Sequence, residues 1–366
     1  MFGGIYRGKR VMVTGHTGFK GSWMAEWLLS LGAEVAGYSL APDTNPSHFD
    51  ILGLSGRIRH VVGDVRDAAS IAALVQDFQP AIVFHLAAQP LVRLSYREPT
   101  STWATNVMGT VNVLEAVRAC GSVKACVVVT SDKCYENREW PWGYRETEAM
   151  GGHDPYSASK GAAELVVASY RRSFFQDPDG CRLASGRAGN VIGGGDWSAD
   201  RIVTDFVKSI LAGKPLSLRN PKATRPWQHV LEPLSGYLEL GRRLLQDEGG
   251  RFADGWNFGP SEDSVVLVQD LARKLVSRWG KGEVVVDTSG NHPHEAGLLK
   301  LDCSKARLEM GWHGVWGVDE TARRVVDWYK EHSEGGDMLS RTREQILSYS
   351  NDARQQGLPW AMEKNA

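Results

Sequence analysis

The 366-residue sequence has no charge excess, no cysteine pattern and no long apolar run. Lys plus Arg number 42 and Asp plus Glu number 43, so the chain has no field for nonspecific nucleic-acid binding. The five cysteines are scattered and lack a CxxC pair, which argues against a disulfide framework or a zinc site. No apolar run approaches the roughly 20 residues of a membrane-spanning helix, and no signal segment precedes the first apolar run. We therefore expect a cytoplasmic protein without metal, nucleic-acid partner or membrane association.

Short apolar runs alternate with amphipathic segments through the first half of the chain. Such runs are typical of strands buried on both faces, and the amphipathic segments are typical of helices. The expected strands are Val11–Thr14, Glu34–Tyr38, His60–Gly63, Ile82–His85, Ala125–Val129 and Leu183–Ala188. The expected helices between them are Gly21–Leu31, Ala69–Phe78, Thr105–Ala119 and Tyr156–Phe174. This alternation predicts an α/β fold with a Rossmann-like, doubly wound parallel sheet.

A glycine-rich loop, GHTGFKG, follows the first expected strand and precedes a helix. In a dinucleotide site, Gly15 would permit the tight turn, Gly18 would let the backbone approach a pyrophosphate, and Gly21 would allow close helix packing. A glycine-rich turn that binds nothing is the plainer interpretation. The strand, loop and helix in succession favour the cofactor site.

Three polar residues near this loop have open interpretations. The second strand leads to Ser39 without the usual ribose-binding acid, and a serine does not distinguish NAD from NADP. Asp64, after the third strand, is placed either to bind an adenine amino group or to cap the following helix. His16 is either a contact for a cofactor phosphate or an exposed loop histidine.

The segment 125–160 carries side chains suited to proton transfer. Its strand ends in the polar run Thr130–Lys133, and Asp154 followed by proline marks the start of a helix. Tyr156 and Lys160 are four residues apart on that helix, so they share one face, where the ammonium would favour the phenolate. Within the polar run, an acid and a lysine side by side also fit a solvated surface ion pair. Their combination with the tyrosine and lysine favours a catalytic site.

Together these motifs resemble the extended short-chain dehydrogenase/reductase family across most of residues 8–260. The matching motifs are the glycine loop, the HLAAQ run His85–Gln89, Asn106 in TNVMGT, and Tyr156-x-x-x-Lys160. Within the family, the run Thr130–Lys133 and the loop from Asn190 to Ile202 resemble the nucleotide-sugar 4,6-dehydratases. Lys133 stands where glutamate is commoner. With GHTGFKGSW and RPWQHVLEP, that lysine resembles the members that act on CDP-glucose.

The resemblance implies five catalytic residues: Ser131, Asp132, Lys133, Tyr156 and Lys160. Tyr156 would take the proton of the sugar's C4 hydroxyl, which Ser131 orients, and Lys160 would lower the tyrosine's pKa. Asp132 would protonate the departing C6 hydroxyl. Lys133 would be the base at C5 if it is neutral, or an electrostatic stabiliser of the enolate if it is charged.

The resemblance also implies a bound NAD and a nucleotide-sugar substrate, CDP-glucose. The expected cofactor-binding residues are Gly15, His16, Thr17, Gly18, Phe19, Gly21, Ser39, Asp64, Val65, Leu86, Ala87, Ala88, Thr130, Tyr156 and Lys160. The expected substrate-binding residues are Gln89, Arg93, Asn190, Arg201, Arg219, Arg225 and Asn257. Arginine suits phosphate because its planar fork bonds it bidentately. The family's arginine near the second phosphate falls around His292 here, and His292 or His294 is expected to replace it.

Beyond Gly189 the alternation of strands and helices loosens. A Gly-rich turn at 193–195, a helix expected at Ile202–Ala212, and a remainder rich in Trp and Pro predict a smaller α+β lobe. We expect residues 1–188 to form the dinucleotide-binding domain, with a return segment at about 228–258. Residues 189–366 would form mainly the substrate-binding lobe, interleaved with it. The family resemblance implies a homodimer, through the helices Thr105–Ala119 and Tyr156–Phe174, or a homotetramer.

Two other functions fit parts of the pattern. A 4-epimerase on the same scaffold would use Tyr156 and the nicotinamide but has no need of Asp132 and Lys133. A non-catalytic regulator that senses NAD would need the glycine loop but not Ser131, Tyr156 or Lys160.

Overall fold

The expected parallel sheet is present in the computed structural model, which describes residues 1–246, 250–287 and 297–362. Seven parallel strands run in the order β11-β6-β5-β4-β1-β2-β3, which confirms the Rossmann-like fold. Their bounds are β1 (Arg10–Thr14), β2 (Glu34–Ser39), β3 (Arg59–Val62), β4 (Ile82–His85), β5 (Ala125–Val129), β6 (Arg182–Arg187) and β11 (Gly255–Asn257). Six of them match predicted strands to within one residue at each end. The three-residue β11 was not predicted.

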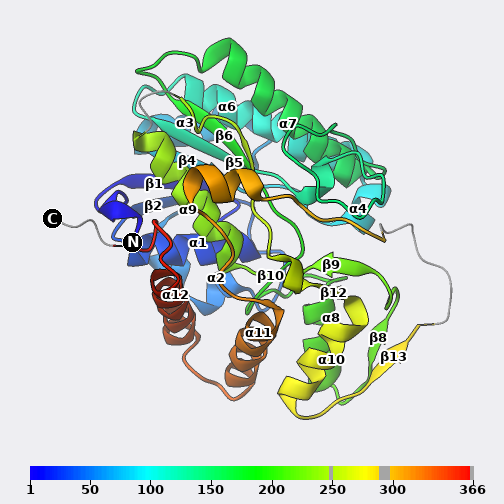
Figure 1. Ribbon diagram of the computed structural model, residues 1–366. Coiled ribbons are helices and arrows are strands. Elements are labelled where there is room, and N and C mark those ends of the chain that lie inside the picture. Colours follow the sequence, from blue (N-terminus) through cyan, green and yellow to red (C-terminus); the bar gives the residue numbers. More distant parts are fainter. Residues whose placement is uncertain (247–249, 288–296, 363–366) are drawn as a thin grey trace.

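Helices cover both faces of the sheet (Figure 1). One face carries α3 (Ala68–Phe78), α6 (Gly109–Arg118) and α7 (Pro155–Phe174), and the other carries α1 (Phe19–Ser30), α9 (Leu231–Gln246) and α12 (Met338–Gln355). Alternate residues of β1 serve the two layers: Val11 and Val13 pack in the core with α1, and Met12 packs in the core with α3 and α6. The inner strands β4 and β5 are therefore buried along their whole length, whereas the edge strand β3 is partly exposed.

Short elements connect the layers of this domain. Their bounds are η1 (Phe2–Gly4), α2 (His48–Ile51), η2 (Leu54–Gly56), α4 (Val92–Arg97), α5 (Pro99–Trp103), the π turn η3 (Ala104–Met108) and η4 (Asp132–Cys134). The helix predicted at Thr105–Ala119 thus begins as a π turn and continues as α6. Asp154 caps α7, accepting a hydrogen bond from the Ser157 amide at 2.9 Å, as predicted. The cap of α3 is Asp67, so the prediction of a cap at Asp64 is wrong.

The lobe lies at one end of the molecule, where Figure 1 shows β8, β13, α8 and α10 together. Three two-stranded sheets and flanking helices make it α+β, as predicted. Its elements are β7 (Val191–Ile192), α8 (Ile202–Leu211), β8 (Leu216–Leu218), β9 (Thr224–Pro226), β10 (Gln228–His229), η5 (Glu262–Ser264), β12 (Val265–Leu267), α10 (Val268–Trp279) and β13 (Val284–Val286). Between β10 and β11 the chain returns to the sheet, where α9 packs against β5 and β6.

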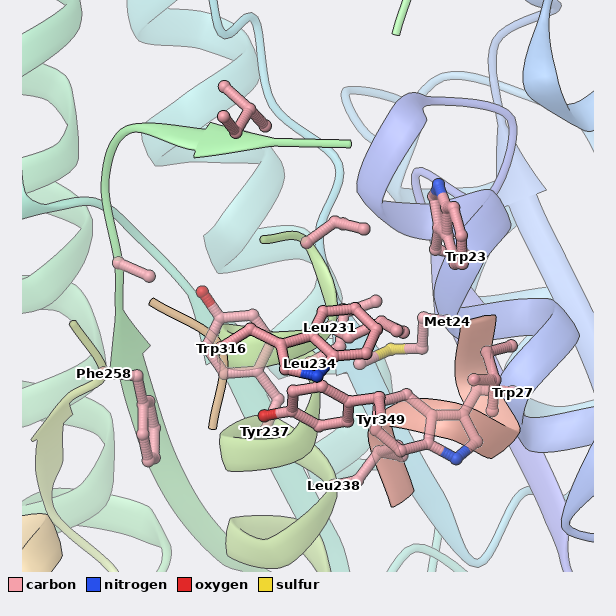
Figure 2. Close-up of a cluster of buried hydrophobic side chains, with 14 of the residues drawn as sticks. Trp23, Met24, Trp27, Leu231, Leu234, Tyr237, Leu238, Phe258, Trp316 and Tyr349 are labelled. Atoms are coloured by element: carbon pink, nitrogen blue, oxygen red, sulfur yellow. The ribbon is translucent and has the colours of Figure 1, made fainter. Parts of the chain in front are cut away.

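The C-terminal segment, in which the sequence shows no motif, folds into η6 (Ala306–Met310), α11 (Val318–Ser333) and α12. Figure 2 shows Trp23 and Trp27 of α1 in one buried cluster with residues of α9 and with Tyr349 of α12. The rings of Trp27 and Tyr349 are 5.9 Å apart and edge to face, and Trp360 stacks on Phe2. Large buried aromatics of this kind contribute most of the packing energy of a core. Helix α12 therefore packs against α1, and Trp360 packs against the N-terminal segment.

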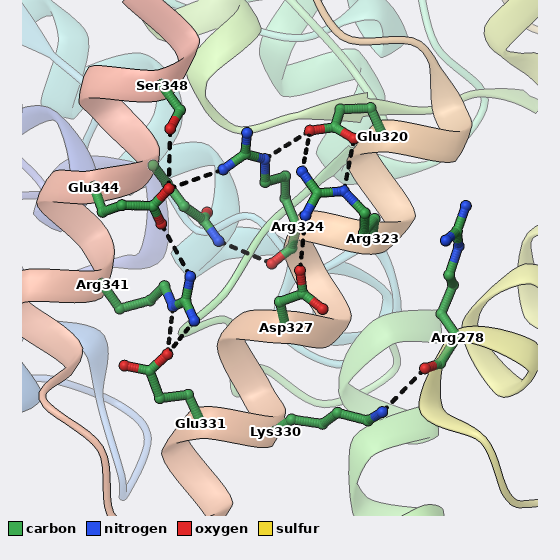
Figure 3. A network of polar contacts seen from close by, with 11 residues as sticks. Arg278, Glu320, Arg323, Arg324, Asp327, Lys330, Glu331, Arg341, Glu344 and Ser348 are labelled. Atoms are coloured by element: carbon green, nitrogen blue, oxygen red, sulfur yellow. Dashed lines mark hydrogen bonds and ion pairs between the residues drawn. The ribbon is translucent and has the colours of Figure 1, made fainter.

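Polar contacts join α11 to α12 at the surface (Figure 3). Arg324 of α11 bonds both Glu320 and Glu344, the latter at 3.1 Å, and Arg341 of α12 pairs with Glu331 and Glu344. Exposed pairs contribute about 0–1 kcal/mol each, so the aromatic core does more to hold α12. Among the described residues, none of the helices has the length and apolarity needed to cross a bilayer.

Candidate active site

A cavity of about 1040 Å³ lies at the carboxyl ends of the strands, between the sheet and the lobe. Ligands of open α/β sheets bind in this position. The cavity is walled by the glycine loop, the ends of β2, β4 and β5, the start of α7, and the segments of the lobe from residue 188 onward. Its volume is at the upper end of the range for a site that takes one small molecule. It is therefore a large site for a single ligand.

The glycine loop has the geometry of a dinucleotide site. Gly15 has φ +75°, and a Cβ there would lie 2.7 Å from the Ala87 amide nitrogen. A Cβ on Gly21 would lie 2.0 Å from the Gly15 carbonyl oxygen. Helix α1 starts after Gly18, and no side chain caps the amides of its first turn. These amides and the helix dipole make an anion site, so the loop fits the pyrophosphate of a dinucleotide.

Most of the other predicted cofactor residues line the same cavity. They are Thr17, Phe19, Ser39, Asp64, Val65, Leu86, Ala87, Ala88 and Thr130. The Thr17 hydroxyl donates to the Leu40 carbonyl and lies 2.9 Å from the Ser39 hydroxyl. The Asp64 carboxylate accepts from the Arg66 side chain and amide, which holds its pKa below the ordinary value. Asp64 is therefore a charged acceptor at the β3 end of the cavity.

His16 corrects one prediction. Its side chain is fully buried beneath the loop and lies outside the cavity, with Nε2 2.7 Å from His60 Nδ1. Burial and then the neighbouring His60 lower its pKa to about 3, so the ring is neutral. The absence of a side chain at Gly37 makes this placement possible, because a Cβ there would lie 2.2 Å from the ring. The interpretation of His16 as an exposed loop histidine was therefore wrong. Its ring is also turned away from the site of a phosphate.

Tyr156 and Lys160 both line the cavity from one face of α7. Burial raises the pKa of Tyr156 to about 12, while a side-chain hydrogen bond with Ser131 and the charge of Arg201 oppose the rise. Burial lowers the pKa of Lys160 to about 8, and its Nζ donates to the Val129 carbonyl oxygen at 3.3 Å. Arg201 is thus a cation that acts on the phenol and that the sequence did not pair with Tyr156.

Asp132 is only 1 % exposed and lies just behind the cavity wall. Its Oδ1 accepts from the Ser131 hydroxyl at 2.8 Å and its Oδ2 from the Asn190 amide at 3.3 Å. A Cβ on Gly189 would lie 1.9 Å from Oδ2, so the carboxyl group is held against bare backbone. This burial overturns the interpretation of a solvated ion pair with Lys133.

Lys133 lines the cavity beside Tyr156, and within the described part of the chain its ammonium has no hydrogen bond or ion pair. The residues next to Lys133 in the chain explain why its side chain points toward the cavity. The short turn η4 follows β5 at once, and the Ser131 hydroxyl accepts from the Lys133 amide at 3.2 Å, which fixes the turn. The turn places Asp132 inward and Lys133 toward the cavity.

A buried acid behind Lys160 was missed in the sequence. Glu164 of α7 pairs with Arg187 of β6 at 2.8 Å and accepts from the Thr130 and Ser185 hydroxyls. Its negative charge raises the pKa of Lys160 against the effect of burial. The signal was present, because Glu164 is four residues beyond Lys160 on the same helix face. The burial of Arg187, which completes the pair, has no sequence signal.

Five of the predicted substrate residues line the cavity: Arg93, Asn190, Arg201, Arg219 and Arg225. Arg93 and Arg219 both pair with Asp200, at 3.5 and 2.6 Å, and Arg201 pairs with Asp196 at 2.7 Å. Arg93 lies on α4, Arg219 directly follows β8, and Arg201 directly precedes α8, so the sheet domain and the lobe both contribute arginines to the cavity.

Gln89 and Asn257, two of the predicted substrate residues, do not line the cavity. The Gln89 amide group bonds the Thr102 hydroxyl and the Leu91 amide. Asn257 is fully buried, bonds the Tyr135 hydroxyl, and donates to the Tyr144 and Asp302 carbonyls. Both side chains are used to hold loops in place. His292 and His294 lie outside the described residues.

Among the described residues, no group of three or more His, Cys, Asp or Glu side chains is placed to hold a metal ion.

The chain belongs to the GDP-mannose 4,6 dehydratase family, whose model matches residues 12–325, and thereby to the extended short-chain dehydrogenase/reductases.

Two relatives and one solved structure show which members of the family the chain is similar to. The chain is 52% identical to the CDP-glucose 4,6-dehydratase of Salmonella typhimurium, over 94% of this chain and 97% of that protein. It is 26% identical to the UDP-glucose 4-epimerase of Mycolicibacterium smegmatis, over 89% of this chain and 100% of that protein. The crystal structure of the Streptomyces venezuelae dTDP-glucose 4,6-dehydratase with NAD bound matches the fold with a TM-score of 0.73 at 24% identity, covering 90% of this chain and 99% of that one.

Proposed function

We propose that this protein is an NAD-dependent dehydratase that converts CDP-glucose to CDP-4-keto-6-deoxyglucose and water. The observation that carries the proposal is one cavity that holds the glycine loop, Tyr156, Lys160 and Lys133, with Asp132 directly behind its wall. The 52% identical relative from Salmonella typhimurium has this activity in its name and supports the choice of substrate.

The cofactor would lie along the glycine loop. The first-turn amides of α1 would bind the pyrophosphate, Asp64 the adenine amino group, and Ser39 a ribose hydroxyl. When bound, NAD supplies a hydride acceptor for C4 of the sugar and a hydride donor for C6. The bound NAD of the Streptomyces venezuelae neighbour supports this assignment.

Tyr156 would begin the reaction as the base that removes the C4 hydroxyl proton. Ser131, which hydrogen-bonds Tyr156, would also orient that hydroxyl. Because burial raises the pKa of the phenol to about 12, the phenolate needs cations nearby. Arg201 and Lys160 supply two of them, and the positive nicotinamide would supply a third.

Asp132 and Lys133 would carry out the loss of water. Once C4 is a ketone, the C5 proton is acidic, and Lys133 would take it in its neutral form. Asp132, which lies buried behind the cavity wall, would give a proton to the C6 hydroxyl, which leaves as water. The hydride then arrives at C6 and Lys133 returns its proton to C5. The proton that Tyr156 took balances the one that Asp132 gave.

Arginines around the cavity would hold the diphosphate of the substrate. Arg201, Arg219 and Arg225 line the lobe side, and Asn190 lies beside Asp132. In the structure, acids of the lobe occupy two of these arginines, at Asp196 and Asp200. A bound diphosphate would compete with these acids for the guanidinium groups, so substrate binding would loosen the contact of Arg219 with Asp200.

The test is incubation of the purified protein with NAD and, separately, CDP-, UDP-, GDP- and dTDP-glucose. We expect the 4-keto product, detected by its absorbance in alkali, from CDP-glucose. A C4 epimer without loss of water would identify the rival 4-epimerase, which has no use for Asp132 and Lys133. Absence of any turnover, with NAD still bound, would favour the regulatory alternative. In that case Tyr156→Phe would leave the protein's function unchanged.

We also propose a homodimer through α6 and α7. Apolar side chains stand exposed on α7 and on η3, which leads into α6, with Met108 at 53 % and Leu165 at 62 % exposure. Leu165→Glu is expected to give monomers in sedimentation velocity, whereas the control Leu347→Glu, on α12 at the opposite face of the sheet and 57 % exposed, is not. A wild-type monomer, or a dimer that persists in Leu165→Glu, would contradict this interface. A homotetramer would show as a second association step.

Location and domain organisation remain parts of the proposal. All five cysteines are free and four are buried, which fits a reducing compartment such as the cytoplasm. We assign residues 1–188 with the return segment at about 228–258 to cofactor binding, and the lobe within 189–366 to the substrate, because the glycine loop and the arginines divide in this way around the cavity.

A further inference from the structure

Lys20 is a charged residue of the cavity that the reaction proposed above does not use. It is the second residue of α1, directly after the glycine loop, and its partly buried side chain lines the cavity. Across the described residues it has no hydrogen bond and no ion pair. A buried or half-buried lysine is ordinarily paired, because its desolvation is otherwise uncompensated. The ammonium group of Lys20 is therefore available to bind a ligand in the cavity.

The charges around Lys20 are mostly of its own sign. Burial, and then the nearby cations Arg201 and Lys160, lower its pKa to about 8, while Asp132 opposes them. These groups come from three elements that face the start of α1: Arg201 precedes α8, Lys160 lies on α7, and Asp132 lies in η4. Arg201 is paired with Asp196 and Lys160 has Glu164 behind it. The acid that acts on Lys20 is Asp132, which is itself bonded to Ser131 and Asn190.

We propose that Lys20 binds a phosphoryl group at the junction between the cofactor half and the substrate half of the cavity. This inference rests on the proposed function for the identity of the two nucleotides. The position of Lys20 supports it from both sides. Its backbone belongs to the first turn of α1, where the dinucleotide pyrophosphate would bind, and its ammonium shares a region with Arg201, a residue proposed to hold the substrate diphosphate.

A phosphate fits this position better than a structural or catalytic role. A structural lysine would have a carboxylate or carbonyl partner, and Lys20 has none among the described residues. A base would have to be neutral, yet an anion placed between Lys20 and Arg201 restores the positive form. The binding of the anion is then linked to uptake of a proton when the pH is near or above the pKa of the free lysine.

The experiment measures binding without turnover. Isothermal titration of NAD, and separately of CDP, into wild type, Lys20→Met and Lys20→Arg gives the dissociation constant for each nucleotide from pH 6.5 to about 9.5. Titrations in buffers of different ionisation enthalpy report the protons taken up. Lys281→Met removes one exposed lysine outside the cavity and controls for net charge. Thermal unfolding of each variant checks the fold.

We expect Lys20→Met to weaken the nucleotide whose phosphate it holds by roughly 10- to 100-fold, the value of a charge-assisted hydrogen bond. A loss confined to NAD assigns the cofactor phosphate, and a loss confined to CDP assigns the substrate phosphate. In wild type the affinity for that nucleotide should fall above pH 8, with proton uptake, because the free lysine becomes neutral there. Lys20→Arg should bind at high pH without this fall.

Affinities of Lys20→Met equal to wild type for both nucleotides would overturn the proposal. So would an equal loss in Lys281→Met, or a loss for both nucleotides that Lys20→Arg does not restore. Binding is read independently of chemistry, so a protein that proves not to be a dehydratase can still pass this test, and an active dehydratase can still fail it.

Discussion

The contact between Gly189 and Asp132 gives the sharpest test of the proposed acid. Gly189→Ala adds a methyl group whose carbon would lie 1.9 Å from Asp132 Oδ2, where ordinary contacts begin at 3.4 Å. The carboxyl group must therefore retreat by about 1.5 Å, and it would lose the alignment of its bonds to Ser131 and Asn190. A misplacement of about 1 Å costs on the order of 100-fold in rate. We expect turnover of Gly189→Ala to fall about 100-fold or more.

The same variant separates the two halves of the reaction. Tyr156 and Lys160 remain in place, so oxidation at C4 should continue while protonation of the C6 hydroxyl is impaired. Reduced nicotinamide should then accumulate after substrate is added, which its near-ultraviolet absorbance reports in a stopped-flow assay. Gly121→Ala is the matched control, because a Cβ there meets nothing within 4 Å. Turnover of Gly189→Ala within a few-fold of wild type, with an unchanged melting temperature, would refute the role assigned to the buried carboxyl.

Three further variants test other buried groups. Tyr156→Phe removes the proposed base, so formation of reduced nicotinamide in a single turnover should slow by about 10²- to 10⁴-fold; rapid reduction would exclude the phenol. Glu164→Gln breaks a buried ion pair with Arg187 and should lower the free energy of unfolding, measured by chemical denaturation, by about 3–5 kcal/mol. The double variant Glu164→Gln/Arg187→Met should lose less, because it leaves no unpaired buried charge. Equal losses in the two variants would contradict this. Burial raises the pKa of Glu232 from 4.5 to about 7, so the unfolded state ionises first as pH rises. Its stabilising effect, up to about 3 kcal/mol, is complete below pH 4.5 and is lost through about pH 7. Glu232→Gln should therefore flatten the pH dependence of unfolding over that window, and an unchanged profile would show that Glu232 does not carry it.

The sequence determined most of the sheet domain. Its strands read as apolar runs because they are buried on both faces, and its helix starts are marked by capping residues such as Asp154. The glycine loop was identified because it lies between a strand and a helix. Tyr156 and Lys160 were identified because they share one helix face and because the motifs together resemble a known family.

The sequence could not determine which polar side chains enter the cavity. His16 lies in the glycine loop but turns under it, into space left by Gly37. Gln89 and Asn257 carry amides suited to a substrate, yet loops from elsewhere in the chain use their hydrogen bonds. Lys20 lies inside a recognised motif, and only the folded structure shows that it has no partner among the described residues.

The amino-acid pattern by itself settled the order and type of the strands and helices around β1 to β6, because burial and local backbone chemistry repeat at short range. Tertiary structure alone decided the burial of Asp132 against Gly189, the pairing of Glu164 with Arg187, and the packing of α12 on α1. Each of these joins segments far apart in the chain, and the free energy of such a contact depends on burial and on partners that no local pattern records.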